Sequence, residues 1–159
     1  DAIEHINLKN IIHNDIHPYN ILYNPSNDKI VIIDFGEAII GSKSIPYIMG
    51  GKCYLYYMPP EKIIKQNSKY YITNKVDIYS IGSILYVLLT GQTLYSYVRP
   101  SEIMETIQNI SDDNKGININ LLSKYSNDCI DLLFKLLDNN PIKRISASEA
   151  LKHNWFKTL

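Results

Sequence analysis

One segment of the sequence, residues 76–90, constrains the fold more than any other because it is apolar on nearly every face of a helix. A helix that is hydrophobic all round is a buried helix, so we expect this segment to lie at the centre of the domain. Asn74 precedes it as a possible N-cap, and Gly91 follows it as a C-terminal stop. The pattern therefore predicts a fold built around one buried central helix.

Shorter amphipathic patterns predict further helices around this one. Residues 1–12 are expected to be the end of a helix. Further helices are predicted at residues 61–65, 101–109, 128–137 and 146–151. The last of them begins with the capping-box pattern, since Ser146 is followed three positions later by Glu149. Residues 36–60 show no clean period and are expected to form a long loop, which is usually functional or disordered in a compact domain. Apart from one small hairpin, the fold class is mainly α.

The hairpin is predicted between two short apolar runs, residues 21–23 and 30–33. The second run is rich in β-branched residues, which favour strands. Residues 24–28 between them, Asn-Pro-Ser-Asn-Asp, are turn formers, because proline fixes φ and Asn and Asp tolerate unusual backbone angles. Such a hairpin would carry Asn20 and Asp34 to the same end of two paired strands.

Asp15 adds a third oxygen-bearing side chain, five residues before Asn20, and Asp34 follows Asn20 after fourteen residues. Hard cations such as Mg²⁺ take oxygen ligands, usually one or two carboxylates together with substrate phosphates. Phosphoryl transfer depends on positioning and charge neutralisation far more than on covalent chemistry. The three side chains therefore predict a site that holds a divalent metal and accepts a proton from a nucleophile.

Composition sets the class of protein. The 159 residues are 45% hydrophobic with a formal net charge of zero, which suits one domain with a sizeable core. A balanced charge gives no reason to expect a nucleic-acid or membrane partner, and the longest apolar run, 84–89, is far too short to span a bilayer. Cys53 and Cys129 form no metal or redox pattern, so we expect a cytoplasmic protein.

Five motifs in register resemble the C-terminal lobe of the eukaryotic protein kinases, of the serine/threonine type. The catalytic loop and the metal-binding D-F-G of that family resemble His13-Asn14-Asp15 with Asn20 and Asp34-Phe35-Gly36. The remaining motifs are Met58-Pro59-Pro60-Glu61, the run from Asp77 to Gly82, and Asn140-Pro141 through Arg144 with His153-Asn154-Trp155-Phe156. The resemblance covers residues 1–159 as one kinase C-terminal lobe. It implies a helical bundle around the buried helix, with the hairpin at the catalytic loop.

The resemblance also implies roles for individual residues. Asp15 would be catalytic and would accept or orient the proton of a protein hydroxyl. Asn20 and Asp34 would hold Mg²⁺ bridging the phosphates of ATP. Leu22 would form part of the floor under adenine, and His17 would stand near the transferred phosphate. The implied activity is transfer of the ATP γ-phosphate to a protein substrate, with serine and threonine preferred over tyrosine.

Other positions would be scaffold. Asp77 would accept hydrogen bonds from the backbone of the catalytic loop, and Glu61 and Arg144 would form a buried ion pair. His13 is expected to be a packed structural histidine beside the loop.

Three positions depart from the family pattern. Asn14 replaces the usual arginine, so a phosphate on the activation segment would lack its usual partner. His17 replaces a lysine, and a neutral imidazole donates one hydrogen bond without the full charge. Tyr54 stands where serine/threonine kinases favour threonine, which leaves the hydroxyl preference open.

The seven glycines form no G-x-G-x-x-G, and no V-A-I-K strand precedes the catalytic loop. The N-terminal lobe that completes the family's ATP cleft is therefore expected to be missing from this chain, which alone should transfer phosphate poorly or not at all. Three hypotheses follow: a protein kinase whose other lobe lies outside these residues, a pseudokinase or scaffold module, and a small-molecule phosphotransferase. The Met58–Glu61 and Asp77–Gly82 motifs argue against the third, and we favour the first.

Overall fold

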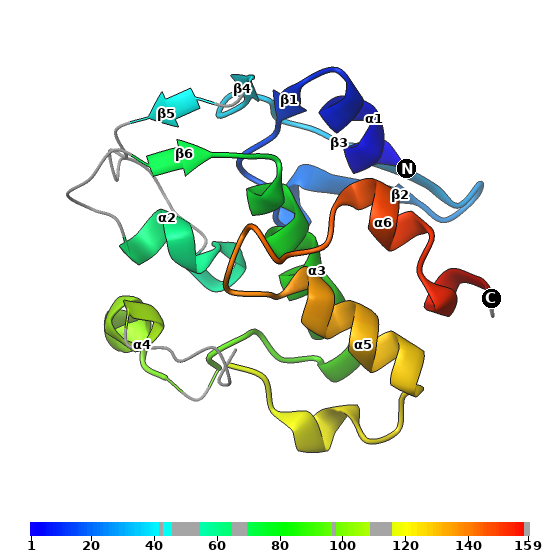
Figure 1. Ribbon diagram of the computed structural model, residues 1–159. Coiled ribbons are helices and arrows are strands. Elements are labelled where there is room, and N and C mark those ends of the chain that lie inside the picture. The colour runs from blue at the N-terminus through cyan, green and yellow to red at the C-terminus, as the bar shows by residue number, and fades with distance from the viewer. Residues whose placement is uncertain (42, 46–54, 65–69, 97, 109–115, 158–159) are drawn as a thin grey trace.

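The computed structural model describes residues 1–41, 43–45, 55–64, 70–96, 98–108 and 116–157 (Figure 1). Cys53 and Tyr54, much of the expected loop at 36–60 and the last residues expected in the helices at 61–65 and 101–109 lie outside them. The helices are α1 (Ala2–Leu8), α2 (Pro60–Ile64), α3 (Lys75–Thr90), α4 (Ile103–Gln108), α5 (Asn127–Leu136) and α6 (Ala147–Leu151). The strands are β1 (Ile11–Ile12), β2 (Ile21–Asn24), β3 (Lys29–Ile32), β4 (Ile39–Ile40), β5 (Lys43–Ile45) and β6 (Tyr70–Ile72).

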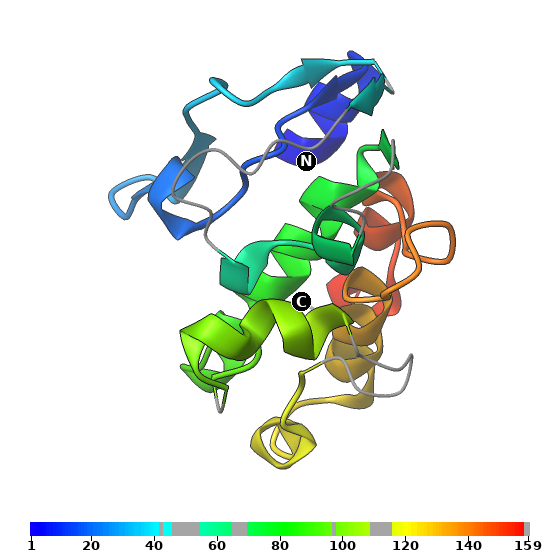
Figure 2. The same ribbon diagram turned by 90° about the vertical axis from the view of Figure 1, so that its left-hand side faces the viewer.

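Helix α3 is the central helix that the sequence predicts, and it runs through the middle of the molecule (Figures 1 and 2). It ends as expected at Gly91, whose φ of +72° lies in the left-handed region that glycine adopts without strain. The N-cap prediction is only half right. Asn74 occupies the N-cap position but makes no side-chain cap bond, and the hydroxyl of Thr73 instead accepts the N–H of Lys75 at 3.4 Å.

The main core forms where α3 packs against α5. Gly82 allows this close approach, since a Cβ at that position would lie 2.9 Å from Cβ of Leu136 and Cδ2 of Leu137. Tyr79, Leu133 and Leu137 are completely buried in this region. The amphipathic α5 thus packs its apolar face on α3. This agrees with the sequence, in which α3 is apolar on nearly every face and α5 on one face only.

The strands form three small antiparallel sheets, β1–β4, β2–β3 and β5–β6, at the top of both ribbon views. The β2–β3 hairpin confirms the prediction, with Ile21 opposite Ile32. Two expectations were wrong. Residues 11–12 are a strand paired with residues 39–40 and not a helix end, and β4 and β5 lie in the segment expected to be loop. These strands have two or three residues each, too few to show a period.

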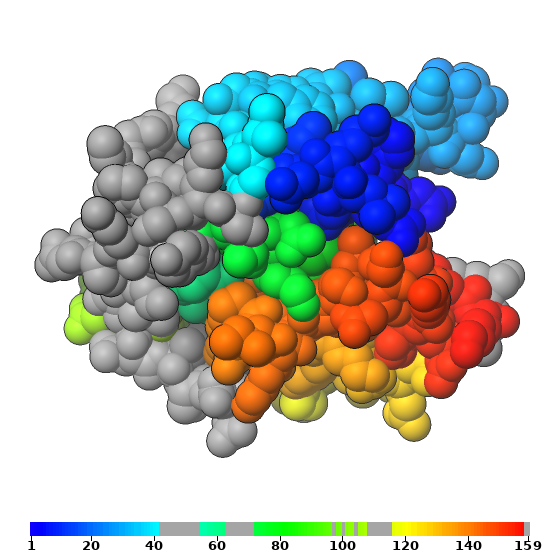
Figure 3. Space-filling model, turned by 45° about the horizontal axis from the view of Figure 1, so that its top comes forward, coloured from blue at the N-terminus to red at the C-terminus, as the bar shows by residue number. Residues whose placement is uncertain are grey.

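Helix α1, at the N-terminus, contacts α6 in the last part of the chain. Figure 3 shows the blue N-terminal segment bordering the orange-red C-terminal segment. The Ser148 hydroxyl on α6 donates to a carboxylate oxygen of Glu4 on α1 at 2.6 Å. The predicted capping box is present, because the Ser146 hydroxyl accepts the Glu149 N–H and the Glu149 carboxylate accepts the Ser146 N–H. Among the helices described, none is both long and apolar enough to cross a membrane.

Candidate active site

The segment between β1 and β2 is held by the first turn of α3. The Asp77 carboxylate, 1% exposed, accepts the backbone N–H of His13 through Oδ2 and that of Asn14 through Oδ1, each at 2.8 Å. Burial raises the pKa of Asp77, while these two hydrogen bonds and the charge of Lys62 act in the opposite direction. The expected bracing of this loop by Asp77 is confirmed.

His13 is the packed histidine that the sequence predicts. Its side chain is completely buried, and its ring lies 4.7 Å from that of Phe35. The Nδ1 atom accepts the N–H of Asp15 at 3.3 Å, and Nε2 lies 3.0 Å from the carbonyl oxygen of Ile33. An imidazole that accepts at Nδ1 and faces a carbonyl at Nε2 is the neutral Nε2–H tautomer. His13 therefore ties the Asp15 backbone to the strand that leads to Asp34.

Asp15, His17 and Asn20 come together around one carboxylate. The Asn20 amide nitrogen donates to Oδ2 of Asp15 at 3.2 Å and to the Asp15 carbonyl at 2.9 Å. The Nε2 of His17 also lies 3.3 Å from Oδ2 of Asp15. His17 and Asn20 are buried, whereas the Asp15 side chain is 39% exposed. Within the described residues, Oδ1 of Asp15 has no hydrogen-bond partner, so it is the oxygen available to a substrate.

Asp34 is joined to this group through the backbone. The N–H of the preceding residue, Ile33, donates to the carbonyl of Asn20 at 2.9 Å. Asp34 itself has a φ of +62° and is exposed, with Oδ1 accepting the Gly36 N–H at 3.1 Å. Leu22 lies on β2 opposite Val31 and is 53% exposed. Among the described residues, no hydrogen bond or ion pair joins the side chain of Asp34 to those of Asp15 and Asn20.

The side chains of Asn20 and Asp34 each offer an oxygen of the kind that binds a hard cation. Both groups that the Asn20 amide nitrogen contacts are acceptors, so the nitrogen faces Asp15 and Oδ1 points away from it. Neither this Oδ1 nor Oδ2 of Asp34 accepts a hydrogen bond from a described residue. Mg²⁺ is usually held by such oxygens together with substrate phosphates. Among the described residues, no three His, Cys, Asp or Glu side chains form a metal-binding group.

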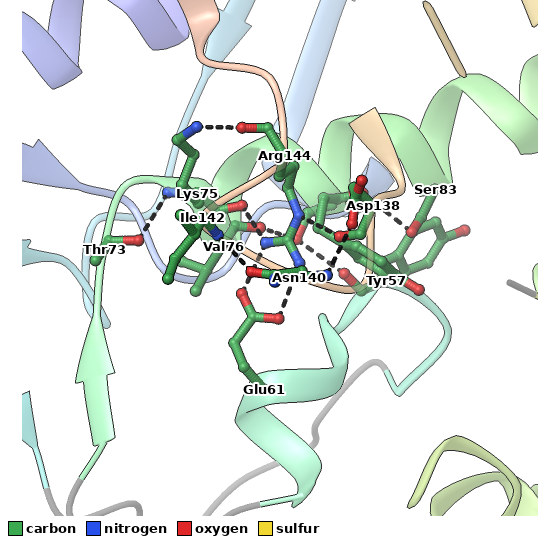
Figure 4. A network of polar contacts seen from close by, with 12 residues as sticks. Tyr57, Glu61, Thr73, Lys75, Val76, Ser83, Asp138, Asn140, Ile142 and Arg144 are labelled. Carbon is green, nitrogen blue, oxygen red and sulfur yellow. Dashed lines mark hydrogen bonds and ion pairs between the residues drawn. The ribbon is translucent and has the colours of Figure 1, made fainter. Parts of the chain in front are cut away.

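Helix α2 contributes the ion pair that the sequence predicts. The Arg144 guanidinium donates to both carboxylate oxygens of Glu61, at 2.7 and 2.9 Å, as Figure 4 shows. It also donates to the carbonyls of Asp138 at 2.8 Å and Lys75 at 2.7 Å, and it lies 4.9 Å from the centre of the Tyr79 ring. Because the Arg144 side chain is completely buried, this pair fixes α2 against the C-terminal part of the fold.

Lys62, also on α2, is a residue that the sequence reasoning missed. It is only 8% exposed, and its Nζ donates to the carbonyl of Asn14 at 2.9 Å. A single lysine following Glu61 at the start of a short helix gives no periodic signal. Its burial follows from the position of α2, which depends on contacts far away in the sequence.

Comparisons with known proteins identify the family. Residues 1–156 match the family described as "Protein kinase domain". The chain is 34% identical over 162 residues to the serine/threonine-protein kinase cds1 of Schizosaccharomyces pombe, across 100% of this chain and 34% of that protein. It is 30% identical over 159 residues to the calcium/calmodulin-dependent protein kinase cmkA of Emericella nidulans, across 99% of this chain and 37% of that protein. The chain thus spans less than half the length of these relatives. It belongs to the protein kinase family.

Proposed function

We propose that these residues form the catalytic loop and the metal-binding end of a protein kinase that transfers the γ-phosphate of ATP to a protein hydroxyl. Serine or threonine is the proposed acceptor, since one relative is named a serine/threonine-protein kinase. The observation that carries the proposal is the Asp15 carboxylate, whose Oδ2 is held by Asn20 and His17 while Oδ1 is left for a substrate. In this proposal, residues outside these 159 complete the ATP cleft, and the protein acts in the cytoplasm.

Asp15 has the geometry of a proton acceptor. A candidate base must come within hydrogen-bond reach of the proton that it takes, and Oδ1 is the atom able to do so. The hydroxyl oxygen forms a bond to the γ-phosphorus, the bond from that phosphorus to the bridging oxygen of ADP breaks, and the hydroxyl proton passes to Asp15. The hydrogen bond from Asn20 and the neighbouring imidazole of His17 keep the carboxylate oriented during this step.

Asn20 and Asp34 are the proposed ligands of Mg²⁺, through the oxygens that accept no hydrogen bond. They would hold the metal beside the phosphates of ATP, where its charge would offset the negative charge that develops during transfer. In this proposal, His17, next to Asp15, also stands near the transferred phosphate. Leu22, half exposed on β2, would lie under the adenine base.

The test is Asp15→Asn in the full-length protein, assayed with Mg-ATP and a generic protein substrate. The amide cannot accept the proton, so phosphate transfer should be lost while the protein stays folded. Asp28→Asn is the matched control, because Asp28 is an exposed carboxylate in the turn of the β2–β3 hairpin, and it should retain activity. Transfer that survives in Asp15→Asn would remove Asp15 from its proposed role.

The alternative is a pseudokinase or scaffold module, which the two departures at Asn14 and His17 favour. Neither side chain supplies the permanent positive charge that the family places at these positions. The same assay separates the two functions. A wild-type protein that is folded and binds Mg-ATP but transfers no phosphate would establish the alternative.

A further inference from the structure

Lys62 is a buried cation to which the proposed mechanism gives no role. Lysine is almost never fully buried unless it is paired, because removing an ammonium from water costs free energy. Here the ammonium reaches across from α2 to the catalytic loop and donates to the Asn14 carbonyl at 2.9 Å. Burial raises the pKa of the nearby Asp77, and the charge of Lys62 partly offsets this rise. These contacts place it at the base of the loop that carries Asp15.

The bond from Lys62 acts on the peptide group immediately before Asp15. The carbonyl of this peptide accepts from Lys62, and its N–H donates to Nδ1 of His13 at 3.3 Å. The preceding N–H, that of Asn14, is held by Asp77. Because a peptide group is planar, holding both its C=O and its N–H fixes its orientation. The Cα of Asp15 lies in that plane, so the plane fixes the point from which the Asp15 side chain leaves the backbone.

The backbone at this point needs such support. Asn14 has a φ of +67°, a left-handed conformation that is uncommon for residues other than glycine, although Asn adopts it more readily than most. Conformations of this kind persist when surrounding contacts determine them. Lys62 and Asp77 hold the two sides of Asn14, one at its carbonyl and one at its N–H.

Helix α2 is itself well anchored, which makes Lys62 a rigid support. Glu61, the neighbouring residue, is paired with the buried Arg144. Successive residues on a helix point about 100° apart, so Glu61 and Lys62 leave α2 in different directions. One binds the C-terminal part of the fold and the other binds the catalytic loop.

We propose that Lys62 is a positioning residue, whose ammonium fixes the Asn14–Asp15 peptide and so orients the Asp15 carboxylate. This inference rests on the proposed function. Lys62 on α2 then supplies a positive charge at the base of this loop, where Asn14 replaces the arginine that is usual in the family.

The experiment compares Lys62→Met, Lys62→Arg and a control in the full-length protein. Lys62→Met keeps an unbranched side chain, one atom shorter, but removes the charge and the donor, and Lys62→Arg keeps both. Lys143→Met is the control, because Lys143 is an exposed lysine. The readouts are kcat and the KM for ATP in protein phosphorylation, and hydrogen exchange of the Asn14 and Asp15 amides.

Lys62→Met should lower kcat about 10-fold to 100-fold, since small misplacement of a catalytic group has effects of that size. The KM for ATP should stay unchanged, because Lys62 has no proposed contact with the nucleotide. Exchange of the Asp15 amide should become faster. Lys62→Arg should retain most of the activity, and Lys143→Met should match the wild type. If Lys62 had only a structural role, Lys62→Met would lower the melting temperature without lowering kcat selectively at an unchanged KM.

The proposal is overturned if folded Lys62→Met keeps the kcat and amide exchange of the wild type. If Lys62→Met does not fold, Lys62→Gln replaces it; its neutral amide is one bond shorter, so a wild-type kcat in that variant would also overturn the proposal. If the wild-type protein transfers no phosphate, the proposed function fails. Amide exchange in the same variants then still decides whether Lys62 holds the Asn14–Asp15 peptide.

Discussion

Glu61→Gln tests how strongly the buried ion pair stabilises the fold. Glutamine keeps the shape of glutamate but removes the charge and turns one acceptor oxygen into an N–H donor. That donor would face the Arg144 guanidinium, which both carboxylate oxygens contact at 2.7 and 2.9 Å in the wild type. Removing one partner of a buried pair typically costs about 3–5 kcal/mol. We expect the lower end, because two carbonyl oxygens still accept from Arg144.

Urea unfolding of the chain, followed by the fluorescence of its one tryptophan, Trp155, measures this loss. With an m value of about 2 kcal/mol per molar urea, a loss of about 3 kcal/mol lowers the midpoint by about 1.5 M. Glu102→Gln is the matched control, because Glu102 pairs with Arg99 on the surface, where the two side chains are 41% and 81% exposed. Exposed pairs contribute about 0–1 kcal/mol. Equal midpoints for the two variants would refute the reasoning.

Two further predictions concern α3. Gly82→Ala should lower the melting temperature by about 2–4 °C, the shift expected for about 1 kcal/mol in a domain of this size. The new Cβ would lie 2.9 Å from Leu136, and overpacking of about 1–3 kcal/mol exceeds the gain in helix propensity of about 1 kcal/mol; an unchanged or higher temperature would contradict this. Burial raises the pKa of Asp77, so the folded state keeps a proton that the unfolded state loses. Its contribution to the free energy of unfolding therefore falls as pH rises from the ordinary carboxyl value through the raised one. Asp77→Asn should remove that part of the pH slope, and an unchanged slope in urea titrations at several pH values would refute it.

The elements that sequence predicted well are those with local causes. Helix α3 ends at Gly91 because glycine alone takes the left-handed conformation there without strain. The capping box of α6 was visible because both partners, Ser146 and Glu149, lie within one turn. The β2–β3 hairpin was equally local, since its strands are joined by a short turn of Asn, Pro and Asp. Each of these features could be derived from neighbouring residues alone.

The features that sequence reasoning missed depend on distant partners. The pairing of Ile11 with Ile40 joins two segments with the whole catalytic loop and the whole β2–β3 hairpin between them. A strand of two residues has no period, so only its partner defines it. The side-chain cap predicted at Asn74 is absent for a more local reason. The hydroxyl of Thr73, one residue earlier, accepts the N–H of Lys75 at the start of α3.

The site shows both kinds of cause. The spacing of Asp15 and Asn20 is local, and their contact was expected from it. The orientation of Asp15 depends instead on His13 bonding to Asp77, 64 residues away, and on Asn14 bonding to Lys62, 48 residues away. The final geometry of the loop therefore depends on α2 and α3 packing beside it. A substitution that shifts the start of α3 should consequently disturb Asp15 without touching it, whereas a change in the exposed β2–β3 turn should leave Asp15 in place.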